Sequence, residues 1–135
     1  MLPDEGLWIL FEPDHLRRVL VNLLDNALEH GTGKPGSLRL RLQTIDDHRA
    51  LLCVSSDGPI VSPEVERHLF EPFFSTRSRG TGLGLYICRE LCERHGAQLD
   101  FRVQAGAEDP RNEFVIAMRR VQASPAVKPN PVAIA

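Results

Sequence analysis

The sequence predicts an α+β fold, a two-layer α/β sandwich in which a mixed, mostly antiparallel sheet carries its helices on one face. Two observations support this class. Apolar residues alternate with polar ones in some segments and recur every three or four residues in others, which indicates strands and amphipathic helices respectively. The expected order is strand, helix, two strands, short helix, loop, helix and two strands, and such an order favours helices gathered on one side of a sheet.

A long amphipathic helix is expected in the first quarter of the chain. It starts after Glu12-Pro13-Asp14, because proline suits the first helical position and acidic residues suit the first turn. Apolar residues then recur at 16, 19, 20, 23, 24 and 27, which is the period of a helix with one buried face. Gly31 follows the last turn and is expected to end the helix.

The remaining elements follow from the same two periods. Short apolar or alternating segments between turn residues predict strands at 7–11, 37–45, 51–55, 99–103 and 113–118. The second and third of these are close enough to form an antiparallel hairpin. A short helix is expected at 63–70, and a second amphipathic helix at 83–95 ends at Gly96.

Length and composition predict one domain. Residues 1–122 are expected to form it, and 123–135, rich in proline and alanine, are expected to be a disordered C-terminal tail. The formal net charge of −2 does not favour nucleic acid, and no apolar run approaches the roughly 20 residues of a membrane span. Three cysteines without metal-type spacing fit a reducing compartment. We therefore expect a cytoplasmic domain with no nucleic-acid partner and no membrane contact of its own.

A glycine-rich stretch before the last helix indicates a phosphate-binding loop. Alternate glycines let the backbone approach a phosphate closely, and the following helix N-terminus favours an anion. Two arginines just upstream add positive charge, and a threonine adds a hydroxyl. The residues expected to contribute are Arg77, Arg79, Gly80, Thr81, Gly82, Leu83 and Gly84.

Three further motifs accompany the glycine stretch. Asn22 and Asn26 share one face of the first helix, where amide oxygens can serve a magnesium–phosphate site. Asp57-Gly58-Pro59 follows a strand, and Phe70 to Phe74 is an aromatic segment beside a loop, as expected for the anchor of a lid. Taken singly, these motifs also fit a solvated helix face, a turn and local core packing.

In combination, the four motifs resemble the conserved boxes of sensor histidine kinases. The likeness extends over roughly residues 7–120 and is greatest to sensor kinases of the nitrogen-regulation and pilus-regulation kind. It implies a Bergerat-type ATP-binding fold. The matching segments are Asn22–Ala27 for the N box, Ser56–Pro59 for the G1 box, Phe70–Phe74 for the F box and Gly80–Leu85 for the G2 box.

The resemblance implies that the cofactors are ATP and Mg²⁺. Asn26 would hold the metal, Asn22 would line the phosphate site and His30 would lie beside the nucleotide. The γ-phosphoryl group would pass to a histidine on a separate dimerisation and phosphoacceptor domain, with a response regulator as the indirect partner. The resemblance also implies that this domain belongs to a larger parent kinase, and some kinases of this family are anchored in a membrane.

The G1 segment departs from the family pattern Asp-x-Gly-x-Gly, in which the aspartate receives the adenine amino group. With Val54 and Gly58 aligned, Ser56 takes the place of that aspartate and Ile60 takes the place of the second glycine. Losing a charged acceptor costs on the order of 1.5–3 kcal/mol, or roughly tenfold to a hundredfold in affinity. Two changes could restore the contact to the adenine amino group. The loop could shift by one residue and bring Asp57 to the base, or a water molecule could bridge Ser56 and the base.

None of the five histidines lies in the His-Glu/Asp context of a phosphoacceptor. We therefore expect the catalytic ATP-binding domain of a histidine kinase that does not phosphorylate itself alone. One alternative is a degenerate nucleotide-sensing or protein-interaction module, a pseudokinase with weak or no ATP binding. Another is a stand-alone serine kinase of the anti-sigma type, which the G2 segment disfavours.

Overall fold

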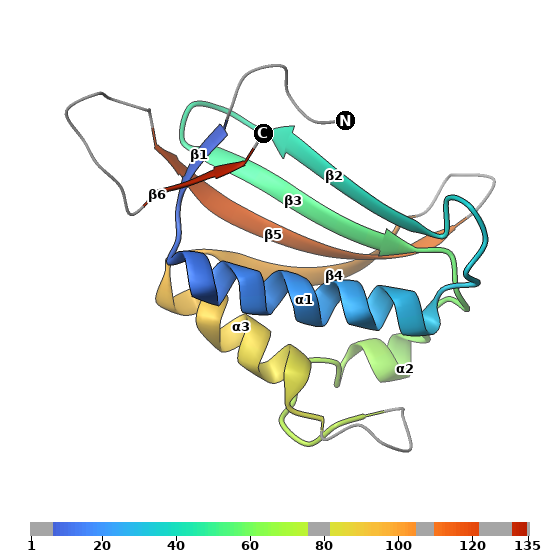
Figure 1. Cartoon of the computed structure of the whole chain (residues 1–135). Coiled ribbons are helices and arrows are strands. Elements are labelled where there is room, and N and C mark those ends of the chain that lie inside the picture. Colours follow the sequence, from blue (N-terminus) through green and yellow to red (C-terminus); the bar gives the residue numbers. More distant parts are fainter. Residues whose placement is uncertain (1–6, 76–81, 105–109, 122–130, 135) are drawn as a thin grey trace.

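The chain folds into a sheet with helices on one face (Figure 1). This computed structural model describes residues 7–75, 82–104, 110–121 and 131–134. The described helices are α1 (Pro13–His30), α2 (Pro63–Glu66) and α3 (Gly84–Arg94). All of them lie on the same side of the sheet, so the α+β class and the one-sided arrangement are confirmed.

The described strands form one six-stranded sheet. The strands are β1 (Leu7–Leu10), β2 (Leu38–Thr44), β3 (Arg49–Ser56), β4 (Gln98–Gln104), β5 (Arg111–Val121) and β6 (Pro131–Ile134). They run in the order β2-β3-β5-β1-β6, and β4 pairs with the first part of β5. Every described pairing is antiparallel, so the expected parallel component is not found among the described strands.

Alternation along the strands separates the core from the open face of the sheet. Leu42, Leu52, Ile116 and Leu99 stand in one cross-strand row and are buried against the helices. Val19 and Leu23 of α1, with Leu91 of α3, pack onto this row and belong to the same core. Burial of this apolar row is the main force that holds the two layers together.

The opposite face of the sheet carries polar and charged side chains and has no described helix on it (Figure 1). Arg39 and Arg41 of β2, Arg102 of β4 and Glu113 of β5 occupy neighbouring outward positions. Glu113 is only 2% exposed, because Arg102 (2.6 Å) and Arg41 (3.6 Å) pair with its carboxylate and cover it. Arg49 and Arg119 extend the same face at its other end.

The ends of α1 explain why it starts and stops where the sequence predicts. The Glu12 carboxylate accepts a hydrogen bond from the His15 backbone N–H at 2.8 Å, and Pro13 takes the first helical position. The Gly31 N–H donates to the Ala27 carbonyl at 2.9 Å and closes the last turn. None of the described helices is long and apolar enough to cross a membrane.

Two segments differ from the sequence prediction. The helix expected at 63–70 ends at Glu66, and its continuation bonds three residues back, from Leu69 N–H to the Glu66 carbonyl, in turns that lead to Pro72. The disordered tail expected at 123–135 is wrong for Pro131–Ile134, which forms β6 beside β1. An edge strand offers unpaired backbone groups, and a proline at the first position of the added strand is compatible with pairing there.

Candidate functional site

A cavity of about 650 Å³ opens between the helices and one end of the sheet. Its walls come from α1, the ends of β3 and β5, the segment that follows β3, the aromatic segment after α2 and the start of α3. Its size falls within the range typical of small-molecule sites. The cavity brings together residues from all four sequence motifs, together with His30: Asn22, Asn26, Ser56, Phe74, Gly82 and Gly84.

The α1 wall supplies the polar groups on one side of the cavity. Asn22, Asn26 and His30 succeed one another at four-residue intervals, so one helix face presents all three. The Cys88 thiol of α3 donates to the Val19 carbonyl oxygen at 3.9 Å, which ties α3 to α1. Burial still raises the pKa of Cys88 to about 11, so this thiol stays neutral and serves packing.

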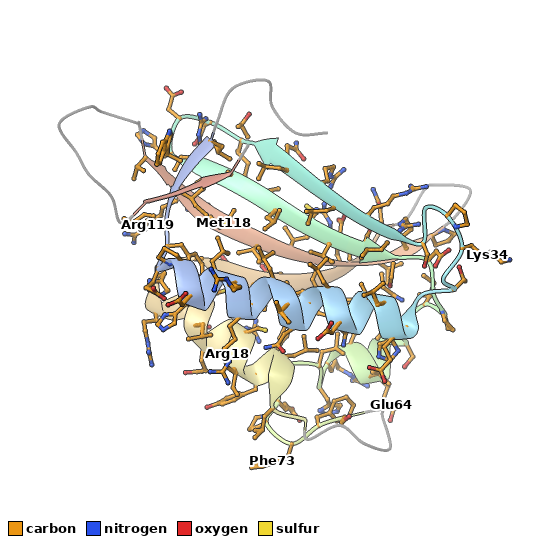
Figure 2. All side chains as sticks on the ribbon, in the orientation of Figure 1. Arg18, Lys34, Glu64, Phe73, Met118 and Arg119 are labelled. Carbon is orange, nitrogen blue, oxygen red and sulfur yellow. The ribbon has the colours of Figure 1, made fainter. Side chains whose placement is uncertain are left out.

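The glycine stretch meets the aromatic segment through the backbone. Gly82 has φ +75°, and a Cβ there would lie 2.3 Å from the carbonyl carbon of Phe73, so only glycine fits this contact. The Phe73 N–H donates to the Gly82 carbonyl at 2.9 Å. Phe73 itself is left-handed (φ 66°) and 76% exposed, and Figure 2 shows it on the side of the helices away from the sheet.

The other glycine-stretch predictions have different outcomes. Gly84 lines the cavity and begins α3, and a Cβ there would meet open space. Leu83 does not line the cavity; it is the residue before α3, and its carbonyl accepts the Ile87 N–H at 2.8 Å. Four further predicted residues lie outside the described part of the chain: Arg77, Arg79, Gly80 and Thr81.

Aromatic rings form the apolar lining beneath the cavity. Phe114 of β5 packs edge-on against Phe101 of β4 (5.1 Å between centroids) and Phe70 (6.2 Å). The Arg89 guanidinium of α3 lies 4.5 Å above the Phe70 ring, in a cation–π contact. The start of the aromatic segment is therefore held by both α3 and the sheet.

Ser56 is the polar residue at the sheet end of the cavity. It ends β3, is 5% exposed and lines the cavity. Its hydroxyl forms no hydrogen bond with any described residue. The Ser56 side chain opens onto the cavity, so its hydroxyl is a group that a ligand can engage.

Asp57 does not reach the cavity, contrary to the sequence prediction that included it. Its carboxylate accepts from the Thr32 N–H (3.0 Å), the Thr32 hydroxyl (2.8 Å) and the Ser37 hydroxyl (2.7 Å). These bonds, the Thr32 N–H first, hold the pKa of Asp57 well below its ordinary value. The side chain is therefore fixed on the loop after α1, and the one-residue shift that would bring it to a base does not occur here.

Gly58 also lies outside the lining, contrary to the prediction, but it shapes the wall. A Cβ at Gly58 would overlap the carbonyl oxygen of His30, at 1.7 Å, so the absence of a side chain lets β3 end directly against α1. Ile60, which takes the place of a family glycine, does line the cavity.

Asn112 is a cavity residue that sequence reasoning missed. It lies opposite Ser56 on β5, is 6% exposed, and uses both amide atoms: Oδ1 accepts the Val61 N–H (2.9 Å) and Nδ2 donates to the Pro59 carbonyl (2.8 Å). Asn112 lies two residues before Phe114 and so faces the same side of the sheet. The sequence prediction missed it because the expected strand, 113–118, began one residue after it. Asn112 therefore fixes the backbone on either side of Ile60.

The lining fits a magnesium–nucleotide complex in its donor chemistry. Mg²⁺ prefers oxygen ligands and is usually held by one or two protein groups together with substrate phosphates. The amide oxygen of Asn26 is such a group. Within the described ranges, no cluster of three His, Cys, Asp or Glu residues could hold a metal by protein ligands alone.

Comparison with known protein families identifies one match. Residues 11–121 match the family described as histidine kinase-, DNA gyrase B- and HSP90-like ATPases. Most of the described structure falls within this range.

Curated relatives are sensor kinases by name. The chain is 43% identical to the sensor protein kinase PilS of Pseudomonas aeruginosa over 67% of its own length and 18% of that protein. It is 36% identical to the sensor histidine kinase ZraS of Klebsiella oxytoca over 66% of its length and 19% of that protein. The chain thus spans about a fifth of the length of these relatives.

Solved structures show the same fold. The mycobacterial sensor histidine kinase MprB aligns with a TM-score of 0.73 and 29% identity, over 84% of this chain and 78% of that one. The catalytic domain of the histidine kinase ThkA aligns with a TM-score of 0.67 and 29% identity, over 82% and 69% of the two chains. The chain belongs to the histidine kinase-, DNA gyrase B- and HSP90-like ATPase family and is an ATPase domain of the sensor histidine kinase type.

Proposed function

We propose that this domain binds Mg-ATP in the cavity and presents the γ-phosphoryl group to a histidine on a separate dimerisation and phosphoacceptor domain. A response regulator would then take the phosphoryl group from that histidine. The observation that carries the proposal is the convergence of Asn22, Asn26, Gly82 and Gly84 on one cavity.

The chemistry asks little covalent participation from this chain. Phosphoryl transfer in kinases depends mainly on positioning and on neutralising charge. Asn26 and Asn22 both line the cavity, where the amide oxygen of Asn26 would hold a magnesium ion and the amide hydrogens of Asn22 would donate to phosphate oxygens. The backbone at Gly82 and Gly84 can approach an anion closely, and the N-terminus of α3 adds a favourable dipole. Because the acceptor histidine lies on a separate domain, the γ-phosphoryl group leaves this domain when it is transferred.

Calorimetric titration of the 135-residue chain with a non-hydrolysable ATP analogue tests the proposal. We expect binding in the presence of Mg²⁺ and a loss of about tenfold or more on Asn26→Ala, because a metal ligand is removed. Without Mg²⁺, wild type and Asn26→Ala should differ much less. Absence of heat at millimolar analogue with a folded protein would contradict ATP binding.

A matched control separates the site from a general effect on the surface. Gln43 is an exposed amide residue of β2 outside the cavity lining. Gln43→Ala should bind the analogue as the wild type does. An equal loss in both variants would show that Asn26 has no special role.

The comparisons give no support to the alternative of a degenerate module, since the relatives named above are kinases by name. Absence of a carboxylate at Ser56 favours weaker binding of adenine, but it leaves the phosphate side of the cavity unchanged. We therefore expect this domain to bind ATP weakly, while the phosphate side of the cavity still holds the phosphates and the magnesium ion.

A further inference from the structure

The sheet end of the cavity differs chemically from the end beside α3. It is built where β3 ends and β5 begins, and apolar side chains surround it, among them Val54, Val61 and Phe114. A flat, largely apolar purine suits such surroundings, whereas phosphates suit the glycine backbone at the start of α3. The polar groups at the sheet end therefore decide which purine is bound.

Only one of these polar side chains is uncommitted among the described residues. Asn112 already gives its carbonyl oxygen to Val61 N–H and one amide hydrogen to the Pro59 carbonyl. Asp57 is bonded to Thr32 and Ser37 on the loop outside the cavity. The Ser56 residue is 5% exposed and lines the cavity, and its hydroxyl has no hydrogen-bond partner among the described residues.

Among the described residues, no carboxylate lines this end of the cavity. The only acid among the described lining residues is Asp25, which belongs to the exposed surface of α1. A carboxylate only accepts hydrogen bonds, so it favours an exocyclic amino group and repels a carbonyl oxygen at the same position. A serine hydroxyl both donates and accepts, so it can pair with either group by rotating its hydrogen.

We propose that Ser56 makes this site tolerant of the purine base, so that guanine nucleotides bind with an affinity close to that of adenine nucleotides. The Ser56 hydroxyl accepts from the 6-amino group of adenine and donates to the 6-oxo group of guanine. A binding site discriminates strongly against a ligand that leaves one of the site's buried polar groups without a partner. Neither adenine nor guanine does so at Ser56. This inference rests on the proposed nucleotide-binding function and specifies its substrate class.

Paired titrations of the 135-residue chain test the inference. Non-hydrolysable ATP and GTP analogues, each with Mg²⁺, are titrated calorimetrically under identical conditions. We expect both to bind, with dissociation constants that differ by less than about tenfold. A preference for the adenine analogue of more than about tenfold overturns base tolerance and leaves the proposed function standing. Failure of both analogues to bind overturns the proposed function itself.

Two substitutions at Ser56 show whether this hydroxyl is the group that reads the base. Ser56→Asp should strengthen the ATP analogue and weaken the GTP analogue, so that their ratio changes by roughly tenfold to a hundredfold in favour of adenine. Ser56→Ala should weaken both analogues by similar factors, because either base loses one hydrogen bond. An unchanged ratio in Ser56→Asp, or unchanged affinities in Ser56→Ala, overturns the assignment.

Thermal unfolding of each variant keeps the outcome interpretable. Should Ser56→Asp fail to fold, the wild-type ratio and the Ser56→Ala titrations still decide the inference. Ser56→Ala removes one oxygen from a cavity wall and is expected to unfold close to the wild-type temperature.

Discussion

The Asp57 carboxylate joins the loop after α1 to the end of β3. Thr32 and Ser37 donate three hydrogen bonds to it, at 2.7 to 3.0 Å. These donors favour the ionised form and hold the pKa of Asp57 below its ordinary value of 3.8. The same contacts that hold the loop also remove Asp57 from the cavity.

A pH-dependent contribution to stability follows from this lowered pKa. The contribution is fully present above the unfolded-state pKa of about 3.9 and is lost as the pH falls below it toward the folded-state pKa. Urea unfolding at pH 7, 5 and 3 should therefore show Asp57→Asn less stable than the wild type at pH 7 and 5, with the difference shrinking at pH 3.

Asp47→Asn is the control for this comparison, because Asp47 is exposed and forms no described side-chain contact. It should track the wild type at every pH. A penalty for Asp57→Asn that is the same at pH 3 as at pH 7 would show that ionisation of this carboxylate does not stabilise the fold.

The position of Asp57 also marks the limit of what the sequence predicts at the scale of single residues. The motif placed a carboxylate beside a glycine after a strand, which fits a ligand contact and a turn equally well. Its donors lie 20 and 25 residues earlier, and only the folded chain brings them together. Conversely, Asn22 and Asn26 were found from a helical period, which is local information, and they do line the cavity.

At the scale of elements, Gly82 joins the aromatic segment to the start of α3. Gly82 has a positive φ, and a Cβ there would lie 2.3 Å from the carbonyl carbon of Phe73, so no side chain fits. Gly82→Ala should lower the free energy of unfolding by about 1–3 kcal/mol, because the variant must adopt a strained backbone or displace the aromatic segment. Urea unfolding at neutral pH measures the change.

Gly84→Ala is the matched control, two residues along the same stretch. A Cβ at Gly84 meets open space, and the residue begins α3 with ordinary helical geometry. Alanine favours a helix over glycine by up to about 1 kcal/mol, so this variant should be neutral or slightly more stable. Equal losses in both variants would contradict the role given to the Gly82–Phe73 contact.

The elements that the sequence predicted well are those whose signal is local. The apolar period of α1 predicted a helix, and the alternation in β2 followed by the short apolar run of β3 predicted two strands that pair as a hairpin. β6 was missed because its pairing partner, β1, is more than a hundred residues away and its own composition of proline and alanine is typical of disorder. Strand pairing at that separation leaves no periodic trace in the sequence.

At the scale of the whole molecule, the chain spans about a fifth of its kinase relatives, and we expect its activity to depend on a second domain. Incubated with Mg-ATP, the 135-residue chain should take up no phosphate. Added to the dimerisation and phosphoacceptor domain of its parent kinase, it should produce acid-labile, base-stable phosphate on that domain, as expected for phosphohistidine.

Asn26→Ala in the same mixture should reduce the labelling in parallel with its loss of nucleotide affinity. Labelling of the isolated chain would contradict the division of labour between two domains. Intact nucleotide binding without any transfer to the histidine domain would contradict the phosphotransfer proposal while leaving the binding site in place.

The open face of the sheet has a consequence for the behaviour of the molecule in solution. Arginines outnumber acids among its described side chains, as Arg39, Arg41, Arg102 and Arg119 show, whereas the whole chain has a formal net charge of −2. Among the described residues, this face is therefore richer in positive charge than the chain as a whole. Adsorption to a charged resin depends on the charge of the face that contacts the resin, because salt screens charges that lie farther away. A cation exchanger should therefore retain this domain at low salt, although its net charge is negative.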